Sequence, residues 1–63
     1  MATDVNTEFA RMMFEHHRRA VTSASWYLKR GDDPQLLAMA ENIMEDQLQE
    51  MDELAEWLEK NGT

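Results

Sequence analysis

Two thioethers and two imidazoles fall within six residues near the start of the chain, in the stretch Met12-Met13-Phe14-Glu15-His16-His17. Methionine sulfur and neutral imidazole are soft and borderline ligands that suit copper, Cu(I) in particular. His16 lies three residues after Met13 and His17 lies four, so each pair can share one face of a helix. This spacing makes Met13, His16 and His17 candidate copper ligands.

Two further methionines in the second half of the chain join this candidate site. When the chain is folded back about residues 31–33, Met13 is expected opposite Met51, with Met44 one turn away. Because thioethers from both halves then converge on one layer, Met51 and Met44 are also candidate metal ligands.

The histidines are expected opposite Gln47 and Leu48 in the same arrangement. Gln47 and Glu50 are polar residues on an otherwise apolar side of their helix, and either can accept a hydrogen bond that fixes the tautomer of a ligating imidazole. His16 and His17 point about 100° apart on a helix, so one can ligate within its own chain and the other across a dimer axis.

The same residues have a structural interpretation. Methionines at helical spacing commonly fill gaps in a core, and a histidine on an apolar face is commonly a hydrogen-bonded core group. In that case Gln47 or Glu50 accepts from the histidines, and the polar network fixes the register of an assembly. The sequence therefore leaves open two functions: metal binding, and an oligomerisation module.

Enzymatic sites are disfavoured by the residues around the histidines. A di-iron site in a four-helix bundle needs Glu-x-x-His, but Met13 and Phe14 stand three residues before the two histidines. The chain has no cysteine, and Ser23 lies about two turns from His16 without an orienting acid. We therefore expect a protein that is not an enzyme.

The charge of the chain limits its partners. Thirteen acidic and six basic residues give a net charge of −7, which repels phosphate backbones and anionic lipid. No apolar run is long enough for a membrane span, and no basic segment followed by an apolar one opens the chain as a secretion signal would. We expect neither nucleic acid binding nor membrane insertion, and the compartment stays undetermined.

Two helices account for almost the whole chain. The first is predicted at about 5–30, since no proline or glycine interrupts it. Asp4 or Asn6 can cap its start, and Gly31 is expected in the left-handed conformation that often ends a helix. The second is predicted at about 34–60, with an aspartate cap followed by Pro34 at the first helical position.

The loop of residues 31–33 is too short for any arrangement other than neighbouring antiparallel helices. The predicted fold is therefore an all-α antiparallel helical hairpin, with residues 1–63 forming one domain. Apolar residues cover roughly half of each helix, more than one hairpin contact can bury. A chain this short also sits near the limit of independent stability. We expect a homodimer or higher homo-oligomer that forms a four-helix bundle.

The sequence resembles the ferritin-like family catalogued as domain of unknown function 305 over nearly its whole length. The residues that carry the resemblance are Phe9, Met13-x-x-His16-His17-x-x-Ala20, Gly31-x-Asp33-Pro34, Ala40-x-x-Ile43, Gln47-x-x-Glu50 and Trp57-Leu58.

This resemblance implies a helical-hairpin unit that assembles into four-helix bundles, and a link to copper. Some members of the family are exported bacterial proteins that bind copper through methionine and histidine, which suggests a periplasmic or secreted location if this chain is a trimmed domain. Met13, His16 and His17 are the positions that match. Ser23 and Leu54 stand where the family usually has methionines.

Overall fold

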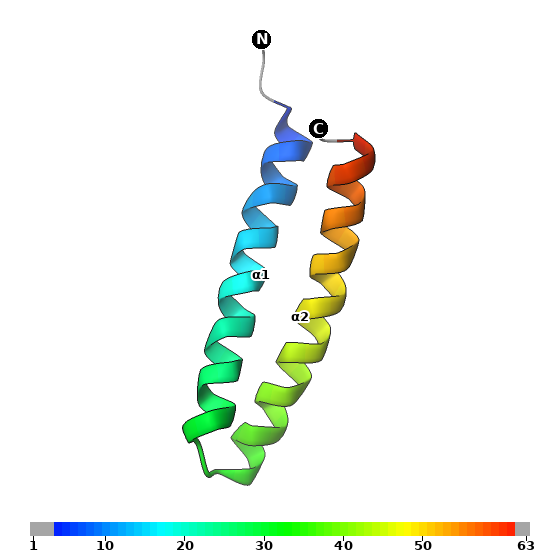
Figure 1. The fold of residues 1–63 in the computed structure, drawn as a ribbon. Coiled ribbons are helices and arrows are strands. Elements are labelled where there is room, and N and C mark those ends of the chain that lie inside the picture. Colours follow the sequence, from blue (N-terminus) through cyan, green and yellow to red (C-terminus); the bar gives the residue numbers. More distant parts are fainter. Residues whose placement is uncertain (1–3, 62–63) are drawn as a thin grey trace.

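The computed structural model describes residues 4–61, which form two helices joined by a three-residue loop. Helix α1 spans Val5–Arg30 and helix α2 spans Pro34–Asn61. The helices lie side by side and antiparallel, with the loop at one end and the start of α1 and the end of α2 at the other (Figure 1). The predicted all-α helical hairpin is confirmed.

A carboxylate caps the start of each helix. The Asp4 side chain accepts from the amide of Asn6 at 3.0 Å and from the hydroxyl of Thr7 at 2.9 Å. At the second helix, the Asp33 side chain accepts from the amide of Leu36 at 2.9 Å. These bonds satisfy amides that have no partner inside the helix, which is why Asp4 caps α1 and Asp33 caps α2.

The loop glycine does not take the left-handed conformation expected from the sequence, and that prediction was wrong. Gly31 is extended, with φ −80° and ψ 160°, and its amide donates to the Tyr27 carbonyl at 2.6 Å. The reason for glycine here is space, because a Cβ at this position would lie only 2.1 Å from Cζ of Tyr27. The Tyr27 ring thus lies against the loop, and its hydroxyl accepts from the Asp33 amide at 3.3 Å.

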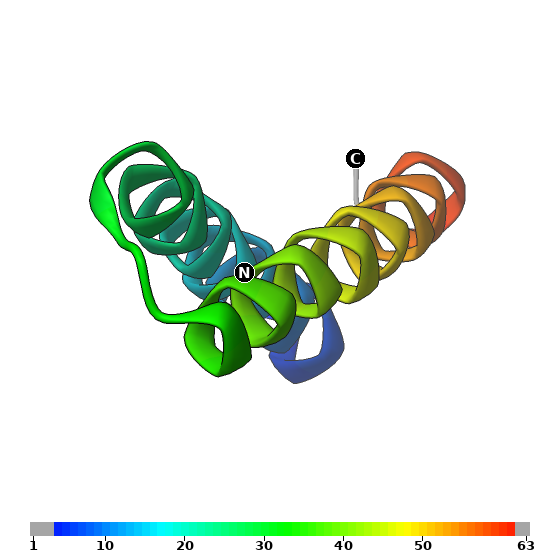
Figure 2. The same cartoon turned by 90° about the horizontal axis from the view of Figure 1, so that it is seen from below.

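The two helices pack through small side chains and bury little else. Ala10, Ala24 and Ala40 are the buried apolar residues, and His17 is the buried polar one. No side chain within residues 4–61 is fully buried. Seen along the hairpin, α1 and α2 cross at an angle (Figure 2). Neither helix is long and apolar enough to cross a membrane.

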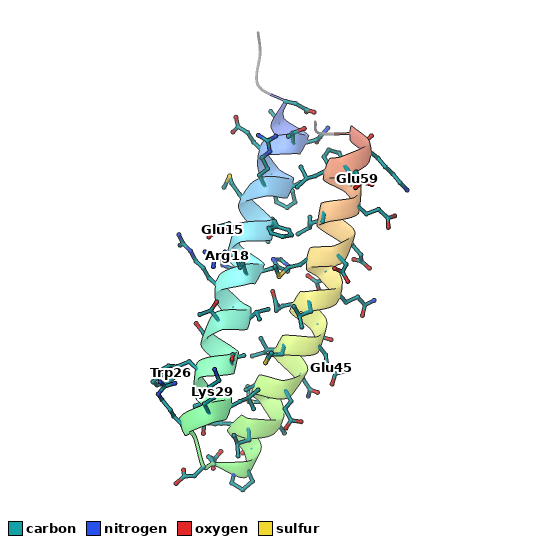
Figure 3. All side chains as sticks on the ribbon, in the orientation of Figure 1. Glu15, Arg18, Trp26, Lys29, Glu45 and Glu59 are labelled. Atoms are coloured by element: carbon teal, nitrogen blue, oxygen red, sulfur yellow. The ribbon has the colours of Figure 1, made fainter. Side chains whose placement is uncertain are left out.

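Charged side chains cover the outer surface. Arg18 donates to Glu15 on α1, and these hydrogen bonds hold the pKa of Glu15 below its ordinary value, with the positive charges of Arg18 and Arg19 acting in the same direction. Trp26 projects from α1 away from α2 (Figure 3), and the Arg30 guanidinium lies 5.3 Å from the centre of its ring. This is a cation–π contact at the surface.

We expect Gly31→Ala to destabilise the hairpin by about 1–3 kcal/mol, because the added methyl overlaps the Tyr27 ring. Alanine also lowers the conformational entropy of the unfolded chain, but this stabilises the variant by only about 0.4–1 kcal/mol. The overlap with Tyr27 should therefore outweigh it, and the net effect should be destabilising. Thermal unfolding followed by circular dichroism measures the effect. The double variant Tyr27→Ala, Gly31→Ala serves as the control, and equal costs of Gly31→Ala in both backgrounds would contradict this account.

Candidate metal centre

His17 is the most constrained polar side chain of the hairpin. It is 7% exposed, and both of its ring nitrogens have partners. Nδ1 donates to the backbone carbonyl of Met13, one turn earlier in α1, at 2.6 Å. Nε2 lies 2.6 Å from Oε1 of Glu50 on α2, within hydrogen-bond distance. This contact links the two helices near the middle of their length.

The sequence placed the histidines opposite Gln47 and Leu48, whereas the structure pairs His17 with Glu50, about one turn further along α2. The tilt of helical side chains explains the difference. Each side chain leans toward the N-terminus of its own helix, so in antiparallel helices the two sets lean in opposite directions. His17 leans toward the open end of the hairpin and Glu50 leans back toward the loop, and they meet between their Cα positions.

Met13, His17 and Glu50 line one hollow, which we call the open-end hollow. Its volume is about 470 Å³, and Phe9, Leu54 and Trp57 form its apolar walls. The Met13 side chain is half-buried there, and the Glu50 side chain is 54% exposed. A thioether, an imidazole and a carboxylate therefore face the same partly enclosed space.

The orientation of the His17 ring is one that metal-binding histidines adopt. Such histidines usually donate one ring N–H to a carbonyl or carboxylate, which fixes the tautomer and presents the other nitrogen to the metal. Here the Met13 carbonyl holds Nδ1, so Nε2 is the nitrogen available for a ligand, and Glu50 is its partner in this structure. A metal on Nε2 would take the place of this hydrogen bond.

The other predicted ligands lie elsewhere. His16 is exposed, with its ring centre 6.3 Å from that of His17. Met44 lines a different groove, together with Val21 and Trp26. Met51 is half-buried between the helices and does not line the open-end hollow. The single chain therefore brings together Met13 and His17, with His16 nearby, but does not bring Met44 to them.

Of the two polar residues predicted to support the histidines, Glu50 contacts His17 and Gln47 is half-buried without a bond to either imidazole. No group of three or more His, Cys, Asp or Glu side chains within residues 4–61 is close enough to hold a metal. The thioether of Met13 is the sulfur group that lines the same hollow as His17.

Sequence reasoning did not single out the walls of the hollow. Phe9, Met13 and His17 are spaced by four residues, and Glu50, Leu54 and Trp57 by four and three, so each trio follows one face of its helix. This periodicity was the available signal. The spacing does not show which residues of α1 contact which residues of α2, because those contacts depend on the angle at which the two helices cross.

The family model described as domain of unknown function (DUF305) matches residues 6–63. The chain belongs to this family. No curated protein and no solved structure matches the chain.

We expect Glu50→Ala to destabilise the hairpin by about 1–2 kcal/mol, because it leaves Nε2 of the buried His17 without its partner. Glu53→Ala is the matched control, since Glu53 borders the same hollow and should change stability by less than about 0.5 kcal/mol. Urea unfolding of the metal-free protein measures both. Equal effects of the two substitutions would mean that the contact with His17 contributes nothing to stability.

Proposed function

We propose that this protein is a small, non-enzymatic Cu(I)-binding protein in which Met13 and His17 are ligands and His16 is the nearest further imidazole. One observation carries the proposal: Nε2 of His17 and the Met13 side chain line the same hollow, while Nδ1 is already held by a backbone carbonyl. The protein would bind or sequester the ion.

The donor set fits Cu(I) better than other metals. Thioether and imidazole are ligands that Cu(I) accepts, whereas magnesium and calcium prefer several oxygens and structural zinc prefers four nitrogen or thiolate ligands. Glu50 is the single carboxylate in contact with His17. Its part in the bound state would be to accept a proton or hydrogen bond beside the site. The copper link that the family resemblance implies favours the same metal.

Anaerobic titration of the apo protein with Cu(I) against a chromogenic chelator tests this function. We expect stoichiometric uptake by the wild type, weakened at least tenfold in Met13→Leu and in His17→Gln. Leucine keeps the apolar volume of Met13, so the loss would come from the sulfur. His16→Gln reports whether the second imidazole takes part.

Met44→Leu is the matched control for the loss of the Met13 thioether. It removes a thioether from the other groove, and we expect its Cu(I) affinity to stay within twofold of the wild type. Failure of the wild type to compete with the chelator would exclude the proposed function. If Met44→Leu lost as much Cu(I) affinity as Met13→Leu, the copper site would not be confined to the open-end hollow.

A second candidate function is a helical-hairpin oligomerisation module, proposed with a homodimer as its product. The supporting observations are that both nitrogens of His17 already have protein partners and that residues 4–61 contain no fully buried side chain. In this function the contact between His17 and Glu50 aligns the two helices, and the stability of the chain comes from pairing with another copy.

The melting temperature separates the two candidates. A ligand at about 100 times its dissociation constant stabilises the state that binds it by about 2.7 kcal/mol, so Cu(I) binding should raise the melting temperature and a chelator should reverse the rise. An unchanged melting temperature in excess Cu(I), measured by circular dichroism under anaerobic conditions, would favour the oligomerisation module.

A further inference from the structure

Two hollows lie on one face of the hairpin, which we call the apolar face. The open-end hollow contains Met13 and His17. The loop-end hollow has a volume of about 330 Å³ and contains the small side chains of Ala20, Ser23, Ala24 and Ala40, with the larger side chains of Tyr27, Leu36, Met39 and Ile43 at its sides. No charged side chain lines the loop-end hollow.

Exposed aromatic and β-branched side chains also lie at the opposite end of the same face. Phe9 is 59% exposed and Val5 is 77% exposed, and the half-buried Trp57 lies next to Phe9 on α2. The exposed ring of Phe9 at the open end and a hollow that contains three alanines at the loop end are complementary shapes. A cavity of about 150 Å³ is enough to hold a benzene ring, so the loop-end hollow has room for an aromatic side chain.

The aromatic side chains and the loop-end hollow lie at similar distances from the middle of the hairpin, on opposite sides of it. The midpoint of α1 falls between His17 and Arg18, and the midpoint of α2 falls between Gln47 and Leu48. A two-fold axis through this level, perpendicular to the helices, exchanges the two ends. It brings Phe9 of one copy level with Ala24 and Tyr27 of the other.

The same axis brings Trp57 of one copy level with Met39 and Ala40 of the other. The aromatic groups of each copy therefore meet the loop-end hollow of its mate on both helices. A two-fold axis along the helices would instead place Phe9 and Trp57 of the two copies at the same level and would leave both loop-end hollows without an aromatic side chain from the other copy.

We propose that two copies of this chain pair antiparallel through their apolar faces, with Phe9 and Trp57 of each copy seated in the loop-end hollow of the other. This orientation rests on the proposed self-association. The hairpin is 50 Å long and 16 Å wide, so one face covers on the order of 800 Å², the area that each partner buries in an interface of standard size.

Antiparallel pairing has a consequence for the metal site. His16 lies within one turn of the midpoint of α1, so it comes within about one turn of the same residue in the second copy. The two open-end hollows then lie on either side of the His16 pair. An exposed imidazole that has no hydrogen bond within the described residues thus gains a second copy of itself as neighbour.

Sedimentation equilibrium of the apo protein, in the presence of a chelator, tests whether the chain dimerises. Distances between spin labels then test the orientation. The chain has no cysteine, so Lys60→Cys gives a single labelling site, on an exposed residue of the last turn. Lys60 lies 12.5 residues from the midpoint of α2, so antiparallel pairing predicts a label separation of about 38 Å at 1.5 Å per residue. A label at Asp32→Cys in the loop should give a similarly long distance.

Two pairs of variants test which residues form the dimer interface. Phe9→Ala should raise the dimer dissociation constant at least tenfold, whereas Trp26→Ala, which removes an aromatic side chain of similar exposure from the other side of α1, should leave it within threefold. Ser23→Arg places a charge in the loop-end hollow and should prevent pairing. Thr22→Arg adds the same charge to the groove that contains Met44 and should not.

Each outcome has a distinct meaning. A monomer in sedimentation at all concentrations would overturn self-association itself. A dimer whose labels lie close together in both Lys60→Cys and Asp32→Cys would overturn the antiparallel orientation and leave self-association standing. If Thr22→Arg prevented dimerisation and Ser23→Arg did not, the dimer interface would lie on the opposite face of the hairpin. Copper uptake is measured in a separate titration, so its failure would not be confused with any of these.

Discussion

Two helices can touch along only one line, and in this hairpin that line is made of small side chains. Ala10, Ala24 and Ala40 let α1 and α2 approach closely, but they bury little apolar surface. The larger apolar residues lie to either side of the line and stay partly exposed. A single copy therefore buries little apolar surface, and the second layer of helices in the proposed bundle would cover more of it.

The contact between His17 and Glu50 is the one polar link across the helices near their midpoint, and it serves both proposed functions. As a structural link it favours a single alignment of α1 against α2, because sliding either helix by one turn would leave the buried imidazole without a partner. In the proposed metal centre it would hold the His17 ring in place, with Nε2 in the hollow that the Met13 side chain also lines, until an ion binds.

The hollows on the apolar face connect these two functions. The open-end hollow combines the sulfur and imidazole donors with aromatic walls, and the loop-end hollow has an alanine floor that suits those aromatic groups. Pairing of two copies would shield the Met13 thioether and the His17 imidazole from water. Exclusion of water favours Cu(I) with soft ligands, so the assembly and the metal site would support each other.

Much of the fold was readable from particular residues. Aspartates at positions 4 and 33, Pro34 and an uninterrupted run of helix-forming residues predicted two helices and a short loop, because capping and proline geometry act within a few residues. Gly31 was read as a left-handed residue from the usual behaviour of glycine after a helix. Its real constraint is the Tyr27 ring, which only the packing of the loop reveals.

The sequence by itself determined the helical hairpin and the candidate donors Met13, His16 and His17, since helix signals and i, i+4 spacings are local. Tertiary structure decided that His17 meets Glu50 rather than Gln47 or Leu48, and that Met44 lies in another groove. These pairings depend on the crossing angle of the helices and on the opposite tilt of their side chains. Neither quantity is encoded in the spacing of residues along one helix, so only the packed pair of helices reveals them.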